Sequence, residues 1–322
     1  MSTKSDSRAV LSDTDFITLF EKAGPYEIHR NTGISLKSVF HRRVNLEKKY
    51  RRQITPPRPY NRTRRNIQHP GRIHYDVLDG HVLVASDAHY WTGPPSVAHR
   101  AFVKFCEDCE PKLVVFNGDA MDGAKISRHP PINWEDRPEV VDELEAVKLR
   151  LGEIEEAVPG NAKLCWTLGN HDSRFETRLA TQAPEYARIH GFHLKDHFGK
   201  RWEPAWSAWI NENVVVKHRI TGGMHATRNN VIRSGMTTIT GHLHSLQVRP
   251  LSTYADRPLW GVDCGMLARP YGPQFAYTED NPVDWRSGFI LLTFYKGILL
   301  WPEIIHYWDD DHVEFRGKLI KC

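Results

Sequence analysis

The sequence has no long apolar run and few cysteines. No stretch of about 18 uncharged apolar residues occurs in the 322 residues, so no membrane span is expected. The first ten residues, MSTKSDSRAV, lack the apolar core of a signal peptide. The five cysteines are scattered and odd in number, so we expect no disulfide framework and a reducing, cytoplasmic location. The remaining composition is typical of a soluble globular protein.

The net charge is only +4, but charged residues are distributed unevenly along the chain. Residues 30–72 hold thirteen Lys or Arg and one acid, a net of +12. Residues 1–29 hold three bases and five acids, and residues 73–322 hold 27 bases and 33 acids. A basic block beside an acidic body predicts a polyanion-binding segment joined to a second domain.

Residues 12–52 are predicted to be helical. One helix ends at Gly24-Pro25, a short helix covers 25–30, and Ser35 is placed to cap a third helix over 36–50. Helix, short helix, glycine turn and basic helix resemble a helix-turn-helix. Either the last helix enters a DNA groove, or the segment is a small bundle with a basic solvated face. The candidate DNA contacts are Lys37, Ser38, His41, Arg42 and Arg43.

Proline and arginine dominate the next segment, residues 53–74. This composition predicts an extended linker rather than a helix or strand. Arg62, Arg64 and Arg65 are placed to follow phosphates, unless the arginines serve only linker solubility.

From residue 75 onward, short apolar runs alternate with helical patterns. The runs cover 82–86, 113–116, 163–168, 214–216 and 237–240, and helices are expected near 95–109 and 138–157. This order predicts an α/β layered architecture with buried strands. Residues 288–295, 298–302 and 314–320 are predicted as antiparallel strands that close one side of the core.

Each of the five apolar runs is followed by side chains that bind metals. In chain order these are D-x-H at 87–89, G-D-x-x-D at 118–122, G-N-H-D at 169–172, His218, and G-H-x-H at 241–244. Because the active site of an α/β sheet lies at the carboxyl ends of its strands, these loops are expected to converge. The set suits two adjacent divalent ions, with Mn²⁺ preferred and Fe, Zn²⁺, Ni²⁺ or Mg²⁺ as alternatives. Two such ions can hold a bridging hydroxide that attacks a phosphorus ester.

The ordered series D-x-H, G-D-x-x-D, G-N-H-D, H and G-H-x-H resembles the calcineurin-like metallophosphoesterases, over about residues 75–250. The resemblance implies an α/β/β/α sandwich in a domain spanning 75–322, after a helix-turn-helix-like segment over 1–52. It implies a first metal bound by Asp87, His89, Asp119 and His244. It implies a second metal bound by Asp119, Asn170, His218 and His242, with Asp119 bridging the two.

The resemblance also assigns roles to three neighbouring residues. His171 would protonate the leaving oxygen or stabilise the transition state, and Asp172 would orient the His171 ring. Asp122 would position a ligand histidine, or would only stabilise its own turn.

Three further residues have alternative interpretations. The family usually has His-Gly after the fourth strand, whereas this sequence has His218-Arg219, which makes His225 a competing ligand. We prefer His218 because it directly ends an apolar run; His225 would then face substrate. His129 and Arg174 follow the second and third motifs and are either substrate contacts or exposed loop residues. Residues 176–212 are a candidate cap over the site, but no sequence pattern indicates where this segment lies.

The substrate is inferred from the motifs and the basic segment together. Asp122-Gly123 and G-N-H-D argue against a protein serine/threonine phosphatase, which carries Asp-Arg-Gly and G-N-H-E at these points. The arrangement resembles phage and prophage phosphoesterases grouped with DNA-repair exonucleases, which predicts a nuclease in a bacterial cytoplasm. The alternatives are an enzyme acting on nucleotides or other small phosphoesters, and a DNA-binding regulator with an inactive phosphoesterase body. The sequence also leaves open whether the protein forms a homo-oligomer.

Overall fold

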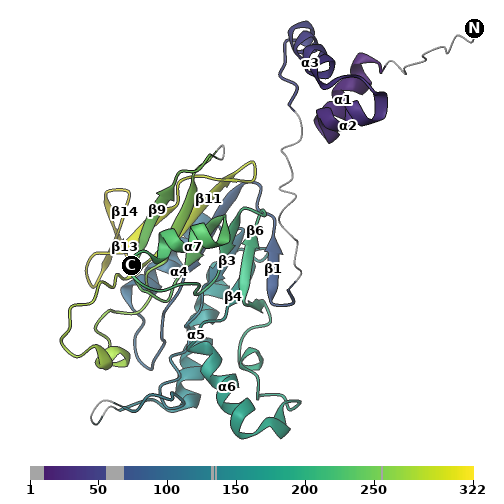
Figure 1. Ribbon diagram of the computed structural model, residues 1–322. Helices are drawn as coiled ribbons and strands as arrows, with labels where there is room; N and C mark the ends of the chain where they lie inside the picture. Colours follow the sequence, from purple (N-terminus) through teal and green to yellow (C-terminus); the bar gives the residue numbers. More distant parts are fainter. Residues whose placement is uncertain (1–10, 56–68, 132–133, 135, 255–256) are drawn as a thin grey trace, which may run out of the picture. The chain divides into compact units, whose positions relative to one another are not determined.

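The computed structural model describes residues 11–55, 69–131, 134, 136–254 and 257–322. The chain divides into two compact units, Met1–Gln68 and His69–Cys322, and each is described by itself (Figure 1). Arg62, Arg64 and Arg65, the predicted phosphate contacts of the linker, lie outside the described residues.

Residues 11–55, the described part of the first unit, form three helices, α1 (Asp13–Ala23), α2 (Pro25–Thr32) and α3 (Leu36–Tyr50). Ser12 and Ser35 cap α1 and α3 by accepting the N–H of the residue three positions later. Gly24 and Gly33 end α1 and α2 with φ values of 83° and 68°, which favour glycine. The helices enclose a small apolar core made of Phe16, Phe20, Ile28, Val39, Leu46 and Ile54.

The candidate DNA contacts on α3 differ in their surroundings. Lys37, Ser38 and His41 are exposed. Arg42 instead donates to the Leu11 carbonyl at 2.7 Å and to Asp13 Oδ1 at 3.0 Å. Its guanidinium therefore ties α3 to the start of α1, and the DNA contact of Arg42 stays a prediction. The fifth candidate, Arg43, is half-buried, and its Nε lies 3.7 Å from a carboxylate oxygen of Glu47.

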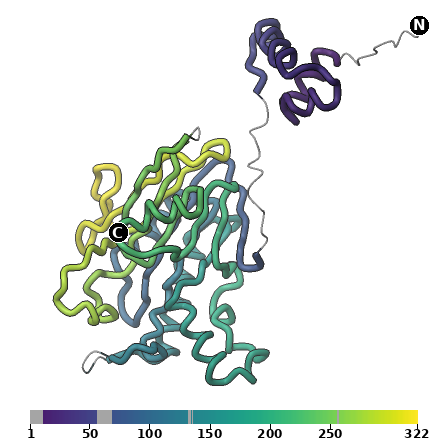
Figure 2. The backbone as a smooth tube through the Cα atoms, viewed as in Figure 1, coloured from purple at the N-terminus to yellow at the C-terminus, as the bar shows by residue number. Residues whose placement is uncertain are grey.

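In the second unit, β2 (Gly80–Ala85) lies at the centre of a nine-stranded sheet within the described residues. Val84 of β2 is paired with Val115 of the parallel strand β3 (Leu113–Phe116) and with Ile290 of the antiparallel strand β11 (Gly288–Tyr295). β11 thus lies beside β2 although the two are far apart in the sequence (Figure 2). The sheet is completed by β4 (Lys163–Thr167), β5 (Trp202–Ala205), β12 (Ile298–Leu299), β13 (Glu303–Tyr307), β14 (His312–Phe315) and β15 (Lys318–Lys321).

A second sheet packs against the first. Its six strands, counted in the described part of the chain, have the order β1-β6-β7-β8-β10-β9. Their bounds are β1 (Arg72–Tyr75), β6 (Ser207–Ile210), β7 (Val214–Val216), β8 (Thr237–Thr240), β10 (Leu259–Asp263) and β9 (Gln247–Leu251).

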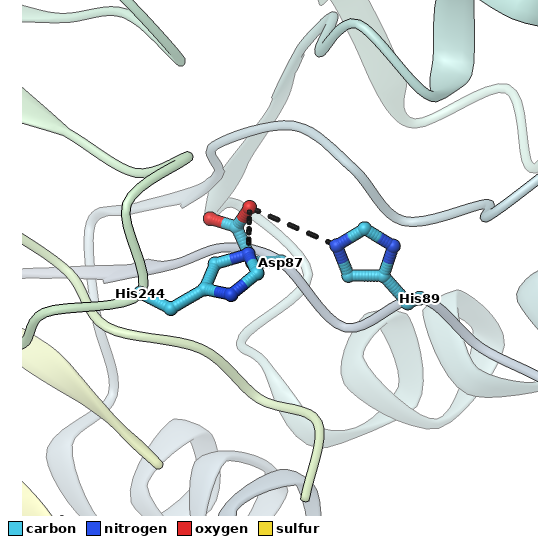
Figure 3. A group of neighbouring side chains, drawn as sticks. All are labelled: Asp87, His89 and His244. Carbon is cyan, nitrogen blue, oxygen red and sulfur yellow. Dashed lines mark hydrogen bonds and ion pairs between the residues drawn. The ribbon is translucent and has the colours of Figure 1, made fainter. Parts of the chain in front are cut away.

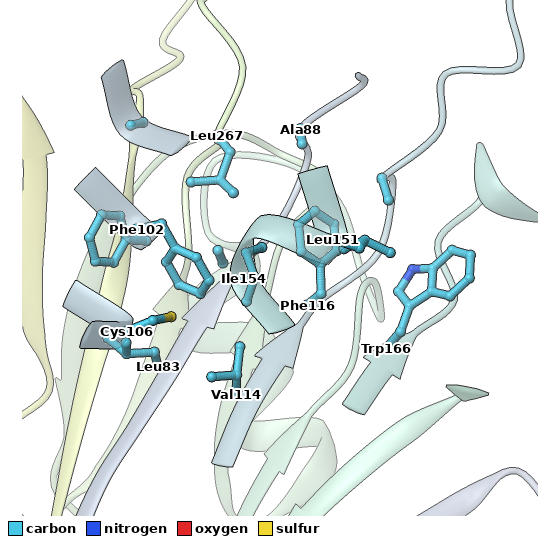
Figure 4. Packing of buried hydrophobic residues seen from close by; sticks show 14 of the residues in the cluster. Leu83, Ala88, Phe102, Cys106, Val114, Phe116, Leu151, Ile154, Trp166 and Leu267 are labelled. Carbon is cyan, nitrogen blue, oxygen red and sulfur yellow. The ribbon is translucent and has the colours of Figure 1, made fainter. Parts of the chain in front are cut away.

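Alternating side chains along β2 divide the core into two layers. Val82 and Val84 pack in the cluster between the two sheets. Leu83 and Ala85 point the other way, into a cluster with α4 (Val97–Cys109) and α5 (Val140–Ala157), where Leu83 lies near Cys106 (Figure 4). On the outer side of the second sheet, α7 (Ala226–Ser234) covers β8 and β10. The predicted α/β/β/α sandwich is confirmed.

Three segments differ from the sequence prediction. Residues 314–320 form the hairpin of β14 and β15 rather than one strand, because Arg316 and Gly317 have φ values of 53° and 74°. Residues 298–302 contribute only the two-residue strand β12. Residues 176–212 are not a separate cap, since they supply most of α6 (Asp172–Gln182), the short helices η1 (Pro184–Tyr186) and η2 (Leu194–His197), and strands β5 and β6. In the described parts of the chain, no helix is long and apolar enough to cross a membrane.

Candidate metal centre

The predicted ligands follow strand ends from both sheets. Asp87 and His89 come after β2, Asp119 after β3 and Asn170 after β4, all in the nine-stranded sheet. In the six-stranded sheet, His218 follows β7, and His242 and His244 follow β8. The strands of each group are parallel neighbours, so their carboxyl ends lie at one edge.

The backbone at these ligands has an unusual conformation. Asp87, His89, Asp119, His242 and His244 have φ values of 55°, 42°, 52°, 72° and 57°. This left-handed region is uncommon for residues other than glycine, and it clusters at functional sites where the surrounding structure imposes it. The loop after β4 approaches the same residues so closely that a Cβ atom on Gly169 would overlap the carboxylate of Asp119.

Asp87 lies between two histidines (Figure 3). Its Oδ1 is 3.1 Å from Nε2 of His244 and 3.9 Å from Nε2 of His89. Its Oδ2 accepts the backbone N–H of His242 at 2.9 Å and the hydroxyl of Ser86. The carboxylate is therefore fixed by the chain, with one oxygen facing the two rings.

Asp119 is at the middle of the cluster. Its Oδ2 is 3.1 Å from Nε2 of His218, and its Oδ1 accepts the backbone N–H of His171 at 2.8 Å. Among the residues that the structure describes, three sets of side chains have ligand atoms within 4.8 Å of one another, and Asp119 belongs to two of them. The sets are Asp87, His89 and His244; His89, Asp119 and His171; and Asp119, His218 and His242.

Outer hydrogen bonds orient two of the rings. Nδ1 of His218 lies 2.7 Å from the carbonyl oxygen of Asn117, which can only accept, so Nδ1 carries the proton. Nδ1 of His89 likewise lies 3.0 Å from Oδ1 of Asp122. The lone pair of each Nε2 therefore faces the cluster, as in metal-binding histidines.

The cluster has the polarity and the free atoms that divalent ions need. Among the described residues, buried Nε2 of His89 and Oδ1 of Asn170 have no hydrogen-bond partner, which is rare in a folded protein. Burial alone would lower the pKa of His218, but Asp119 and Asp87 raise it to about 10. The carboxylates thus attract positive charge strongly, and the residues present fit a pair of divalent metals.

The structure gives His171 a partner other than the predicted one. Nδ1 of His171 lies 2.9 Å from Oδ1 of Asp122 and 2.9 Å from the Asp122 carbonyl oxygen. Burial lowers the pKa of His171, but Asp119 and Asp122 outweigh it and raise the pKa above its usual value. Asp122 therefore contacts both His89 and His171, and it has the positioning role predicted for it.

Asp172 does not orient His171, which corrects the sequence prediction. Its carboxylate accepts the backbone N–H groups of Asp119 at 2.8 Å, Ala120 at 2.9 Å, Met121 at 3.1 Å and Gly169 at 2.8 Å. It also accepts the indole N–H of Trp166 at 3.3 Å. Asp172 thus holds together the loops that carry Asp119 and Asn170.

The remaining candidates lie outside the ligand cluster. His225 is exposed and precedes α7 as its N-cap residue, whereas His218 is buried against Asp119. His129 is exposed in the loop after the second motif. Arg174 donates to the Asp122 carbonyl at 2.7 Å, and its Nη2 lies 3.2 Å from Nε2 of His171.

Residues 80–246 match the calcineurin-like phosphoesterase family. The chain belongs to this family. No curated protein sequence matches the chain at a significant level. Among solved structures, a single-residue variant of Vps29 from Entamoeba histolytica is similar, with a TM-score of 0.40 and 13% sequence identity. That similarity covers 75% of this chain and 99% of the Vps29 chain.

Two groups near the centre of this phosphoesterase were missed in the sequence. Asp263 ends β10, and its Oδ1 accepts the N–H groups of Ser245 at 3.1 Å and Gly265 at 3.0 Å, next to His244. The apolar run before Asp263 is a sixth strand followed by a carboxylate, a signal that the pattern of the other five strands could have revealed. Asn117, whose carbonyl orients His218, had no such signal.

An aromatic wall of Phe275, Tyr277 and Trp285 borders one side of the centre. The Phe275 ring is 5.1 Å from the His89 ring, and the Trp285 ring is 4.6 Å from the His244 ring. Tyr277 lies 6.3 Å from both other aromatic rings and is more than half exposed. The wall thus covers the ligands assigned to the first metal.

Removing divalent metal is expected to lower the thermal stability of the protein. Ions that bind only the folded state at about 100 times their Kd would add about 2.7 kcal/mol, or roughly 5–10 °C in Tm. Thermal unfolding in Mn²⁺ and in EDTA measures this difference. Equal Tm values in both conditions would contradict a metal centre made by these residues.

Glu143 is expected to make stability depend on pH. It is buried and accepts the N–H groups of Gly123 at 2.6 Å and Ala124 at 3.0 Å, behind Asp122. Burial raises its pKa from 4.5 to about 7, against the effect of the two hydrogen bonds. The folded state therefore binds the proton more tightly than the unfolded state, and stability falls as the pH rises from 4.5 to 7.

The contribution that is lost amounts to about 3 kcal/mol. Tm measured from pH 4.5 to 8 should fall more steeply for the wild type than for Glu143→Gln, which cannot ionise. Parallel curves for the two proteins would show that Glu143 is not the responsible group.

Proposed function

We propose that this metal-dependent phosphoesterase is a phosphodiesterase that hydrolyses DNA, with Mn²⁺ as the favoured ion. The observation that carries the proposal is the presence of both a buried ligand cluster and a net charge of +12 over residues 30–72 in one chain. The cluster supports phosphoester hydrolysis, and the basic block supports a polyanionic substrate.

The residues of the cluster have distinct tasks. Asp87, His89 and His244 would hold one ion, His218, His242 and Asn170 the other, and Asp119 both. When bound, the two ions supply a nucleophile at neutral pH and neutralise charge on the phosphate. Because Asp87 and Asp119 are held by backbone N–H groups as well, they keep their geometry while substrate enters.

His171 is placed to act on the leaving oxygen. Asp122 holds its Nδ1, so a proton on Nε2 would face the substrate, and the raised pKa favours that protonated form. In the structure Nε2 instead accepts from Nη2 of Arg174 at 3.2 Å and carries no proton in that contact. A substrate oxygen would take this position, which leaves Arg174 beside the phosphate as a second positive charge.

The three-helix unit would supply DNA affinity. Lys37, Ser38 and His41 are exposed together near the start of α3, the position of the recognition helix in a helix-turn-helix. Tethering this unit to the catalytic unit raises the local concentration of DNA. This organisation supports the phage-type, repair-exonuclease-like assignment within the family.

A gel assay tests the proposal directly. Full-length protein is incubated with linear duplex and single-stranded DNA in Mn²⁺ or in EDTA, with Asp119→Asn as the control. We expect metal-dependent degradation that the variant lacks, and the fragment pattern separates endonuclease from exonuclease action. Hydrolysis of monoesters with neither diesters nor DNA attacked would overturn the proposal.

A small nucleotide is the second candidate substrate, favoured by the aromatic wall. One base could stack on Tyr277, which is exposed beside the metal ligands. A micromolar KM for a mononucleotide that is unchanged in Lys37→Glu/His41→Glu would favour this candidate over DNA.

A further inference from the structure

A basic groove opens beside the metal centre. It has a volume of about 410 Å³ and reaches Asn170, a ligand of the second metal, whereas the aromatic wall covers ligands of the first. One border is α6 and another is the loop at 126–129. Five of its residues are basic or imidazole side chains, Arg128, His129, Arg174, Arg178 and Arg219, and none of its lining residues is acidic.

The groove leads away from the catalytic centre along α6. This helix begins at Asp172, next to the ligand loop, so each later turn lies farther from the metals. Arg174, Arg178 and Gln182 are four residues apart and therefore lie on one face, at intervals of about 6 Å. The same face presents the hydroxyl of Thr177, which can donate to a phosphate oxygen, whereas the Thr181 hydroxyl donates to the Thr177 carbonyl at 2.7 Å.

The outer arginines of the groove have no acidic partner. Arg128, Arg178 and Arg219 are exposed, and no carboxylate pairs with them among the residues that the structure describes. Some arginines elsewhere on the surface are paired with a carboxylate, such as Arg52 with Glu21 and Arg316 with Glu303. Several unpaired like charges around one groove repel each other, and a bound polyanion removes this repulsion.

The loop at 126–129, which is the other border of the groove, is held in place by hydrogen bonds from within the chain. Arg137 donates to the carbonyl oxygens of Ala124 at 3.0 Å and Pro130 at 3.2 Å, at the two ends of the loop that presents Arg128. Arg174 connects the groove to the centre, because its guanidinium contacts both Asp122 and His171. The basic side chains therefore form a continuous series that starts at the general acid.

We propose that this groove binds the phosphates that flank the scissile phosphate on one strand of a polynucleotide. Arg174 contacts the nearest phosphate, and Arg128, Arg178 and Arg219 contact the following ones. The inference rests on the proposed DNA-hydrolysing function, and it places strand recognition in the catalytic unit as well as in the three-helix unit.

The test measures binding without turnover. A fluorescein-labelled oligothymidylate of 20 nucleotides is titrated with full-length protein in EDTA at several salt concentrations. Each lost phosphate contact should reduce the slope of log K against log salt by about 0.7 for a single strand, so Arg178→Ala/Arg219→Ala should reduce it by about 1.4. Arg233→Ala, an exposed arginine on α7 outside the groove, is the matched control and should leave the slope unchanged.

Equal slopes for the wild type and the double variant would overturn the groove proposal, because binding would then belong to other parts of the chain. Inorganic tripolyphosphate provides a second arm. If the double variant loses affinity for tripolyphosphate but not for the oligonucleotide, the groove is a site for small polyphosphates and the strand proposal is wrong.

Hydrolysis assays distinguish a failure of the groove proposal from a failure of the proposed function. In Mn²⁺, the double variant should lose at least about ten times more kcat/KM on the oligonucleotide than on bis(p-nitrophenyl) phosphate, which has no flanking phosphates. Wild-type protein that binds through the groove but cleaves neither substrate would contradict the proposed function and leave the groove supported. Cleavage of both substrates, with equal losses of kcat/KM in the double variant, would support the proposed function and contradict the groove proposal.

Discussion

Replacing Asp119 by Asn is expected to reduce kcat/KM for a phosphodiester by about 10³-fold or more, which corresponds to about 4 kcal/mol of transition-state stabilisation. Asp119 is the one carboxylate shared by two of the three ligand sets in the described residues. Its Oδ2 lies 3.1 Å from Nε2 of His218, and its charge is the main cause of the raised pKa of that histidine. The amide keeps the shape but removes the charge that two cations would share.

The measurement combines turnover with metal content. Hydrolysis of bis(p-nitrophenyl) phosphate in Mn²⁺ gives kcat/KM, and mass spectrometry of the dialysed protein gives the number of ions bound. We expect the variant to lose at least one of two ions. Asp108→Asn, an exposed aspartate paired with Lys104 on α4, is the matched control. Activity of Asp119→Asn within tenfold of the wild type would rule out a bridging role.

Replacing Asp172 by Asn is expected to destabilise the fold by about 3 kcal/mol and to lower Tm by roughly 6–12 °C. The buried Asp172 carboxylate accepts four backbone N–H groups from two loops, and an amide replaces one acceptor oxygen by a donor. The N–H groups that lose their acceptor remain buried without a partner. Asp280→Asn, an exposed aspartate far from strand ends, serves as the control and should not change Tm.

The same variant distinguishes the two roles considered for Asp172. If the residue oriented His171, Asp172→Asn would change the pH profile of kcat and leave Tm unaltered. The structure predicts the opposite, a large loss of Tm with the His171–Asp122 contact retained. An unchanged Tm together with a shifted pH profile would restore the prediction made from sequence.

The convergence of the predicted ligands could be anticipated because each follows a short apolar strand. Asp87, Asp119 and Asn170 come after β2, β3 and β4, and the strand order then brings them together. The roles of supporting residues could not be predicted in this way. Asp122 and Asp172 are both acids of a recognised motif, and only the folded loops determine which one meets the ring of His171.

Features that combine distant segments were also inaccessible from sequence. β5, with the sequence WEPA, contains a proline and lacks apolar alternation, so its pairing with β4 depends on tertiary packing. The basic groove takes Arg128, Arg178 and Arg219 from three separate stretches, none of which has a charge run of its own. Arg42 likewise was expected on a DNA-facing surface, but Asp13, which lies far away in the sequence, engages it.

The left-handed backbone at Asp87, His89, Asp119, His242 and His244 has a consequence for how the enzyme acquires its ions. These conformations are imposed by the loops and by hydrogen bonds such as that from the His242 N–H to Asp87, so the geometry belongs to the polypeptide. Ions can then leave and return without refolding. Divalent ions of similar size compete for such a set of ligands, so the metal composition of the enzyme would follow the supply of free ions in the cell. Its turnover rate would then vary with growth conditions at constant protein level.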